Sequence, residues 1–305
     1  MNSRAHARAG RVRSLVLCLC AAVTTICLAA APANAQTGGL SLAGAGTKAK
    51  VSYGQALELS GRAGAAGPVR LEYAPRGGGW RSLRQTVASA GGSYRFTLRP
   101  ISSGAFRAVS QEGISSTRVV TVVARLAGHA SRHVRAGSRV RLRGRLAPGF
   151  AGRRVRLQLA TGRGWRTVDR TRTGRGGRYH AAWRTGIAGR YRLRVKFGGD
   201  GRNSAVSRTL RGRVNVYRAS AASWYGPGFY GNHTACGRIL GSATLGVANR
   251  SLPCGTRVTL RYHGRSVTVP VIDRGPFGGG REWDLTSATK QRLGFGDIGT
   301  LWVTR

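Results

Sequence analysis

The sequence predicts an all-β protein with two immunoglobulin-like β-sandwich repeats and a mostly β C-terminal domain that contains one short helix. Three observations lead to this class. Short runs alternate apolar and basic residues, glycine-rich turns separate these runs, and one group of motifs occurs twice at a constant offset. Hydrophobic residues make up 41% of the 305 residues, which suffices for packed cores despite 47 glycines.

The N-terminus predicts export. Four arginines precede an apolar run at 14–31, and the Ala-Asn-Ala tripeptide at 33–35 fits the small-x-small rule for signal cleavage. We assign residues 1–35 to a signal peptide and 36–44 to a linker. A retained membrane anchor is the alternative, although the apolar run is at the lower limit for a membrane span. The expected product is secreted and cell wall-associated, with no stable membrane insertion.

Signal cleavage also decides the cysteine count. Three of the five cysteines lie before the cleavage site, so the mature chain keeps Cys236 and Cys254. An even number of cysteines in an oxidising compartment predicts a disulfide between them. Histidine and cysteine show no metal-ligand spacing, and we therefore expect neither a metal site nor a cofactor.

The charge is strongly positive. Lysine and arginine total 51 against 9 acidic residues, which gives a formal net charge of +42, and all but four of the basic residues are arginines. So few carboxylates exclude a calcium cage, and the positive charge predicts an anionic partner. For an exported protein this partner is an anionic wall polymer rather than nucleic acid. Solubility and protection of edge strands form the alternative explanation of the arginine-rich sheets.

The central part of the chain is an internal repeat. Related tripeptides surround Trp80 and Trp165, and the motifs around Tyr94 and Tyr179 are separated by the same 85 positions. One module of about 85 residues therefore occurs twice, at 45–124 and 128–216. Period-two alternation within the second module predicts strands, with apolar side chains on one face and basic ones on the other. No residue of either module suggests catalysis.

The C-terminal domain, 219–305, has a different composition, with clustered aromatic residues and new prolines. We predict a first strand, a hairpin that turns at His263-Gly264, a short extended segment, a helix and a last strand. The helix is expected to start at a Thr286 or Ser287 cap and to stop at Gly294. The predicted ranges are 219–225, 257–262, 266–272, 283–285, 286–293 and 301–304.

Five separated motifs of this domain resemble the rare lipoprotein A (RlpA) family, in order and in spacing. They are Ala-Ser-Trp-Tyr-Gly at 222–226, Thr-Ala-Cys-Gly at 234–237, Leu-Pro-Cys-Gly-Thr-Arg-Val at 252–258, Asp-Arg-Gly-Pro-Phe at 273–277 and Asp-Leu-Thr at 284–286. The resemblance implies a six-stranded double-psi β-barrel that acts on peptidoglycan, in well-known members as a lytic transglycosylase. The paired cysteines also resemble expansin and barwin-like barrels, whose expansin members loosen walls without evident hydrolysis.

Two positions depart from the family pattern. Members with lytic activity carry a glutamate directly after the Thr-Ala-x-Gly motif, where this chain has Arg238. They usually carry a histidine where this chain has Asn249, whereas Asp273 is retained. Glu282 is the only candidate for a replacement carboxylate.

Asp273 is therefore the predicted catalytic acid and base, since one carboxyl group can protonate the glycosidic oxygen and then accept a proton. The alternative role of Asp273 is structural, as a turn carboxylate paired with an arginine. Asp284 precedes the helix and is expected to accept its backbone N–H groups, with substrate contact as its second role. The predicted substrate-binding residues are Tyr225, His233, Thr234, Arg274 and Asp284.

Two functions from different classes remain open at this point. The first is a lytic transglycosylase that uses Asp273 alone. The second is a non-catalytic peptidoglycan-binding or wall-loosening module, which uses the same groove with Asp273 as a hydrogen-bond acceptor. Family resemblance favours the enzyme, whereas Arg238 and the cysteine pair favour the binding module.

Overall fold

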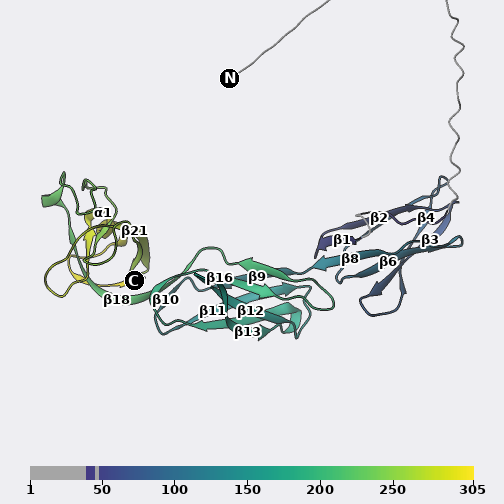
Figure 1. The fold of residues 1–305 in the computed structure, drawn as a ribbon, viewed down its shortest axis with the longest axis horizontal. Coiled ribbons are helices and arrows are strands. Elements are labelled where there is room, and N and C mark those ends of the chain that lie inside the picture. The colour runs from purple at the N-terminus through teal and green to yellow at the C-terminus, as the bar shows by residue number, and fades with distance from the viewer. Residues whose placement is uncertain (1–38, 45–47) are drawn as a thin grey trace, which may run out of the picture. The chain divides into compact units, whose positions relative to one another are not determined.

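A computed structural model describes residues 39–44 and 48–305, so the predicted signal peptide lies outside the described residues. Nearly all the regular structure in the described part is β-strand (Figure 1), which confirms the all-β prediction. No helix among residues 39–44 and 48–305 is long and apolar enough to cross a membrane. The described end of the predicted linker packs against the first repeat, where Leu42 is fully buried in the core.

The first repeat has two sheets around one core. The larger sheet has the order β1-β8-β6-β3-β4 with β7 beside β6, and the smaller one pairs β2 with β5. Buried leucine, valine and aromatic side chains fill the space between them because they point inward at every second residue. The strands are Lys48–Ser52 (β1), Leu57–Arg62 (β2), Gly67–Pro75 (β3), Arg81–Ala88 (β4), Ser93–Leu98 (β5), Gly104–Ser110 (β6), Gly113–Ile114 (β7) and Arg118–Val123 (β8).

The second repeat is also built from two sheets, β14-β11-β9 and β13-β12-β16-β17. Val140 and Leu142 are buried while Arg141 and Arg143 are exposed, which confirms the predicted alternation. The elements are Arg125–Ala130 (β9), His133–Arg135 (β10), Arg139–Ala147 (β11), Arg154–Thr161 (β12), Gly164–Arg172 (β13), the 3-10 turn Arg175–Gly177 (η1), Arg178–Arg184 (β14), Gly189–Tyr191 (β15), Leu193–Phe197 (β16) and Val206–Thr209 (β17).

The C-terminal region forms the predicted six-stranded barrel. Its strands follow the order β18-β22-β19-β21-β20-β23, and a pairing of β18 with β23 closes the sheet. The first part of β18 also pairs with β10 and β15, so this strand starts before the predicted position 219. The elements are Val214–Tyr225 (β18), the 3-10 turn Pro227–Phe229 (η2), Val247–Ala248 (β19), Arg257–Tyr262 (β20), Arg265–Asp273 (β21), Trp283–Thr286 (β22), Ser287–Leu293 (α1) and Gly299–Val303 (β23).

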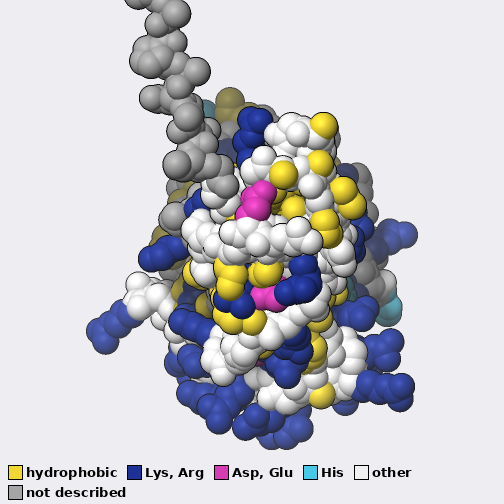
Figure 2. All heavy atoms as spheres, turned by 90° about the vertical axis from the view of Figure 1, so that its right-hand side faces the viewer, with side chains coloured by type: hydrophobic (Ala, Val, Ile, Leu, Met, Phe, Trp, Pro, Cys, Tyr) yellow, Lys and Arg dark blue, Asp and Glu magenta, His cyan; other side chains and the backbone are white. Residues whose placement is uncertain are grey.

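Basic side chains dominate the visible surface. In Figure 2 lysine and arginine side chains project around the face that is shown, whereas aspartate and glutamate form only small isolated patches. This distribution follows from the composition, because many outward positions of the repeat strands are arginines while the buried positions are mostly apolar.

The helix α1 begins and ends at the residues that the sequence predicts. Thr286 is the N-cap, and its hydroxyl accepts a hydrogen bond from the N–H of Thr289. Gly294 ends the helix in the left-handed conformation, with φ 62°. Both cap predictions are therefore confirmed.

We expect Thr286→Ala to lower the free energy of unfolding of the barrel by about 1 kcal/mol, because the N-cap acceptor is lost. Chemical denaturation with and without the substitution measures this change. Thr300→Ala, at an exposed position of β23, provides the control and should stay within about 0.5 kcal/mol of the parent. Equal stability of the Thr286 variant and the parent would show that the cap contributes nothing.

Candidate functional site

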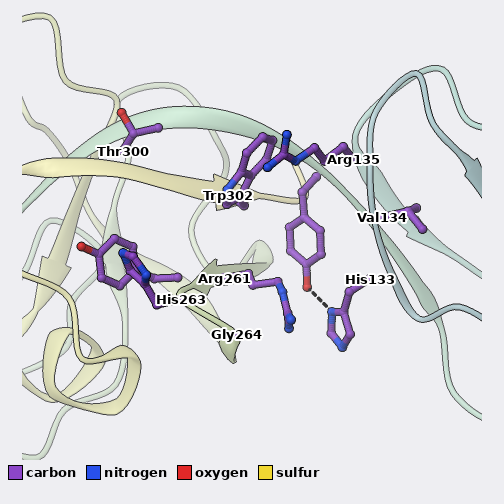
Figure 3. Close-up of a pocket in the computed structure, with 10 residues that line it drawn as sticks. His133, Val134, Arg135, Arg261, His263, Gly264, Thr300 and Trp302 are labelled. Atoms are coloured by element: carbon purple, nitrogen blue, oxygen red, sulfur yellow. Dashed lines mark hydrogen bonds between the residues drawn. The ribbon is translucent and has the colours of Figure 1, made fainter.

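A cavity of about 380 Å³ is lined by aromatic and basic side chains and by no carboxylate. His133 and Tyr217 meet in it through a hydrogen bond of 2.7 Å between Nδ1 and the hydroxyl (Figure 3). Burial lowers the pKa of His133, and the positive charges of Arg261 and Arg132 lower it further. Because this cavity offers no acidic group for glycoside chemistry, the candidate site is sought at the carboxylates of the barrel.

Asp273 ends β21, and backbone N–H groups fix its carboxylate. Its Oδ1 accepts hydrogen bonds from the N–H of Ala235, at 2.9 Å, and of Arg274, at 2.8 Å. The backbone carbonyl of Asp273 accepts a third bond, from the N–H of Asn249 at 3.1 Å. The residue is half-buried, so its carboxyl group is oriented by the fold and still reachable from solvent.

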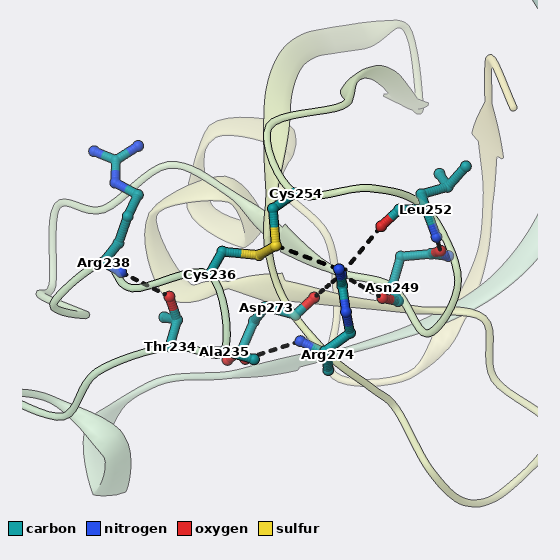
Figure 4. The surroundings of a disulfide bond; sticks show 9 residues. All are labelled: Thr234, Ala235, Cys236, Arg238, Asn249, Leu252, Cys254, Asp273 and Arg274. Atoms are coloured by element: carbon teal, nitrogen blue, oxygen red, sulfur yellow. Dashed lines mark hydrogen bonds between the residues drawn. A yellow bond between two sulfur atoms is a disulfide. The ribbon is translucent and has the colours of Figure 1, made fainter.

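A disulfide holds the Ala235 donor in place. Cys236 follows Ala235 directly and is bonded to Cys254, with a Cα–Cα distance of 5.7 Å (Figure 4). The N–H of Cys236 donates to the carbonyl of Ile272 at 3.3 Å, which ties the same loop to β21. The predicted disulfide therefore lies beside the predicted catalytic residue and fixes one of its hydrogen-bond donors.

Arg274 supports the loops around Asp273 instead of neutralising its charge. Its guanidinium donates to the carbonyls of Asn249, at 3.3 Å, and Leu252, at 3.1 Å, and reaches the Cys254 sulfur at 3.3 Å. Across residues 39–44 and 48–305, Asp273 forms no ion pair with any arginine. The structural alternative for Asp273 therefore stands without its arginine ion pair among the described residues, while the carboxylate still accepts from the N–H of the next residue, Arg274.

The segment from His233 to Arg238 is a closed turn. The buried Thr234 hydroxyl accepts from the N–H of Arg238 at 3.2 Å, and the Thr234 N–H donates to the Arg238 carbonyl at 2.7 Å. The guanidinium of Arg238 is exposed and extends away from Asp273 (Figure 4). The His233 side chain is also exposed. The turn thus positions Ala235, while Arg238 leaves the surroundings of Asp273 open.

A second carboxylate, Asp284, lies two strands away from Asp273. The strand β19 lies between β21 and β22. Its residue Ala248 pairs with Asp273 on one side and with Asp284 on the other. Two strand spacings of about 4.8 Å put the two backbones roughly 10 Å apart. The Asp284 carboxylate accepts a hydrogen bond from the Ser223 hydroxyl. The expectation that Asp284 accepts the helix N–H groups is wrong, because Thr286 is the cap.

The hydroxyl of Tyr225 lies near both carboxylates. Burial raises the pKa of Tyr225 far above its ordinary value, and the negative charges of Asp273 and Asp284 raise it further. The phenol therefore stays protonated at any physiological pH. Its hydroxyl is buried and makes no hydrogen bond of regular geometry with the described residues. The structure thus adds a buried, protonated hydroxyl to the aromatic ring on which the prediction of Tyr225 rests.

Trp224, the neighbour of Tyr225 on β18, points to the opposite side, as the alternation predicts. Its indole N–H donates to Asp297 at 2.8 Å, and the Lys290 ammonium lies 3.8 Å from the ring centroid. The Trp224 side chain therefore contacts Asp297 and Lys290 and not Asp273 or Asp284.

Glu282, the candidate replacement carboxylate, is held elsewhere. Arg218 forms an ion pair with it, and the Ser220 hydroxyl donates to it at 2.6 Å. The hydrogen bond from Arg218 is the main cause that lowers the pKa of Glu282. A carboxylate kept ionised by an arginine is a poor proton donor, so Glu282 does not take the place of a missing acid.

Sequence reasoning missed several residues that shape the site. Ala235 and Ser223 act through a backbone N–H and a hydroxyl, and Ala248 through its position between two strands. Asn249 is buried, and its side-chain oxygen accepts from the N–H groups of Ser251 and Leu252. An asparagine side chain often accepts from the backbone N–H two residues later and so starts a turn. This local preference would have identified Asn249 as a structural residue.

The comparisons with known proteins agree with the resemblance. Residues 217–304 match a family model described as "Lytic transglycolase". A probable endolytic peptidoglycan transglycosylase RlpA of Synechocystis sp. is 44% identical over 98 residues, which are 28% of this chain and 30% of that protein. An endolytic peptidoglycan transglycosylase RlpA of Neisseria meningitidis is 43% identical over 84 residues, which are 27% and 35%. The chain spans about a third of the length of these curated relatives.

Among solved structures, the Streptomyces papain inhibitor is similar at 24% sequence identity and a TM-score of 0.24, over 29% of this chain and 94% of that one. The resemblance of the C-terminal domain to the RlpA family is therefore confirmed, together with the six-stranded barrel.

Proposed function

We propose that the C-terminal barrel acts on peptidoglycan and cleaves its glycan strands as a lytic transglycosylase, with Asp273 as acid and base. The observation that carries this proposal is the Asp273 carboxylate, which two backbone N–H groups orient and no basic side chain neutralises. The match of residues 217–304 and the names of the relatives support peptidoglycan as the substrate.

The proposed reaction needs one proton carrier and no water. In its acid form Asp273 gives a proton to the glycosidic oxygen as the bond from the muramic C1 to this oxygen breaks. The resulting carboxylate then accepts the proton of the muramic C6 hydroxyl while O6 forms a bond to C1. The proton returns to Asp273, and the product carries an anhydro-muramic end.

Asp284 and Tyr225 fit supporting roles in this reaction. Positive charge develops at C1 as the glycosidic bond breaks, and a fixed carboxylate near the reacting bond stabilises it. Asp284 is restrained for that role by the Ser223 hydroxyl. The protonated Tyr225 hydroxyl supplies a hydrogen-bond donor toward Asp273 or a sugar oxygen. The exposed His233 stays a proposed substrate contact, whereas the buried Thr234, which was predicted for the same role, is better placed to hold the turn, and Arg274 is a positioning residue.

Incubation of the exported chain with purified peptidoglycan tests the proposal. Mass spectrometry of the released fragments is expected to show anhydro-muramic ends that increase with time. Reducing ends instead would indicate hydrolysis, and wall binding without any new ends would contradict the enzymatic function.

Removal of the Tyr225 hydroxyl should slow cleavage while the fold is kept. A hydrogen bond to a charged group contributes about 1.5–3 kcal/mol, so we expect Tyr225→Phe to reduce the cleavage rate about 10- to 100-fold. Tyr230→Phe is the matched control, because that exposed hydroxyl bonds to Ser287 at 2.8 Å and away from the carboxylates. Equal rates for the two variants would exclude a role of the Tyr225 hydroxyl.

A non-catalytic function of the same groove is the second candidate. Arg238 favours this function, because it stands where lytic members carry a glutamate. Of the two carboxylates of those members, only Asp273 is then present for acid and base catalysis. In that case Asp273 and Tyr225 hold a glycan strand by hydrogen bonds without cleaving it, as proposed for wall-loosening barrels. The fragment analysis separates the two functions, since only the enzyme creates new chain ends.

The N-terminal signal supports a place for the protein outside the cytoplasm, in the cell envelope where peptidoglycan lies. The two repeats, proposed at 45–124 and 128–216, would then carry the barrel of residues 219–305. The immunoglobulin-like type of their β-sandwiches stays a prediction.

A further inference from the structure

One sheet of the second repeat presents a continuous basic surface. In β14-β11-β9 every second side chain points outward, and no glutamate or aspartate of these strands is among them. We call this surface the basic face. It consists of seven exposed arginines and two exposed histidines: Arg125, His129, Arg139, Arg141, Arg143, Arg145, Arg178, His180 and Arg184.

Like charges lie directly opposite each other on the basic face. Arg139 pairs with Arg184, and Arg145 pairs with Arg178, in the antiparallel ladder of β11 and β14. Such pairs destabilise a sheet, and within the described part of the chain none of the seven arginines forms an ion pair. The neighbouring carboxylate of Asp169 is occupied by backbone N–H groups. The face therefore carries a large excess of positive charge, which the single negative charge of Asp169 offsets only in small part.

The fold does not demand arginine at these positions, as the first repeat shows. There the pair Leu57–Leu98 occupies the place of Val140–Trp183, because the pair Gly61–Tyr94 of the same ladder corresponds to Gly144–Tyr179. Counting along the same ladders, Glu58 stands where the second repeat has Arg141. Ser60 corresponds in the same way to Arg143, and Ser93 to Arg178.

The matching strands of the first repeat carry an acid that the basic face lacks. Arg95 lies 3.7 Å from Glu58 across the strands β2 and β5. The same two-strand ladder thus exists in this chain with an acidic partner for one arginine in the first repeat and without any acid in the second. The high arginine content of the chain as a whole does not explain why the first repeat has Glu58 where the second repeat has Arg141.

The geometry of the basic face suits an extended chain with regularly spaced anions. Alternate residues of a strand are about 6.8 Å apart and neighbouring strands about 4.8 Å, so the guanidinium groups form a flat grid. The two non-bridging oxygens of a phosphodiester diverge and can accept from arginines on two neighbouring strands, such as Arg145 and Arg178. The face has no tryptophan, tyrosine or phenylalanine on which nucleic-acid bases could stack.

We propose that the basic face binds a linear phosphodiester polymer of the cell wall. This binding site is separate from the barrel and does not depend on whether Asp273 cleaves glycan strands. It would hold the protein against the wall through many weak, exchangeable contacts, each of which releases a counterion.

The test uses the full exported chain and poly(glycerol phosphate) as the probe, with binding measured by calorimetry over a series of salt concentrations. One variant takes residues from the first repeat: Arg141→Glu, Arg143→Ser and Arg178→Ser. The matched control removes the same charge from exposed arginines outside the face: Arg84→Glu, Arg163→Ser and Arg208→Ser.

We expect the face variant to weaken binding at least tenfold and to lower the slope of log Kd against log salt by about 2, for three lost contacts. The control should change Kd less than threefold. The face variant should also keep or raise the unfolding temperature, because opposed like charges are removed. Equal losses in both variants, no binding by the parent, or equal affinity for duplex DNA would each overturn the proposal.

Discussion

Asp273→Asn should abolish the formation of anhydro-muramic ends and leave the barrel folded. General acid–base catalysis contributes about 10²- to 10⁴-fold to a rate, and an amide can neither give nor take the proton. The oxygen of asparagine still accepts from the N–H groups of Ala235 and Arg274, so the loops around the site keep their hydrogen bonds. Mass spectrometry of digested peptidoglycan measures the loss.

Asp284→Asn provides the comparison. Its side-chain oxygen still accepts from Ser223, but the negative charge is gone. We expect a cleavage rate lowered about tenfold, because charge stabilisation is lost while the proton carrier stays. If instead Asp284→Asn abolishes cleavage and Asp273→Asn does not, the roles assigned to the two carboxylates are reversed. Unchanged cleavage in both variants would leave only contamination or another group as the source of activity.

Removal of the disulfide should both destabilise the barrel and impair its site. Cys236 and Cys254 are 18 residues apart, and closing a loop of this size contributes about 3 kcal/mol to stability in the chain-entropy model. In Cys236→Ala/Cys254→Ala the Ala235 loop is also free to move away from Asp273. We therefore expect a lower unfolding temperature of the barrel in calorimetry and slower cleavage below that temperature.

Reduction of the parent protein is the control for the double variant. Reduced parent and double variant should unfold at similar temperatures, because both lack the same cross-link. A double variant that is as stable as the oxidised parent would contradict the prediction. If the double variant loses the expected stability but cleaves peptidoglycan as fast as the oxidised parent, the N–H of Ala235 does not need the disulfide to stay in place.

Local patterns were enough to predict much of the fold. The hairpin of β20 and β21 turns at His263 and Gly264, which both have positive φ, as the sequence predicts. The ends of α1 follow from its capping residues in the same way. Such features depend on residues that are close in the chain, and a single sequence shows them directly.

The site depended on contacts between distant residues and was only partly predictable. Ser223 and Asp284 are 61 positions apart, and only the parallel pairing of β18 with β22 brings them together. Asp284 was therefore assigned to the helix that follows it in the chain. The prediction of Tyr225 rests on its ring, because nothing in the sequence shows that the charges of the two carboxylates act on its hydroxyl.

The closure of the barrel bears on how the protein resists aggregation. An open sheet exposes unpaired N–H and C=O groups that recruit strands from other molecules. The pairing of β18 with β23 removes both edges of the barrel. The first repeat keeps an edge at β4, where exposed Arg81 and Arg84 repel a second copy of the same strand. Closure of the barrel and charge at the β4 edge thus both work against strand-to-strand association of this β-rich chain.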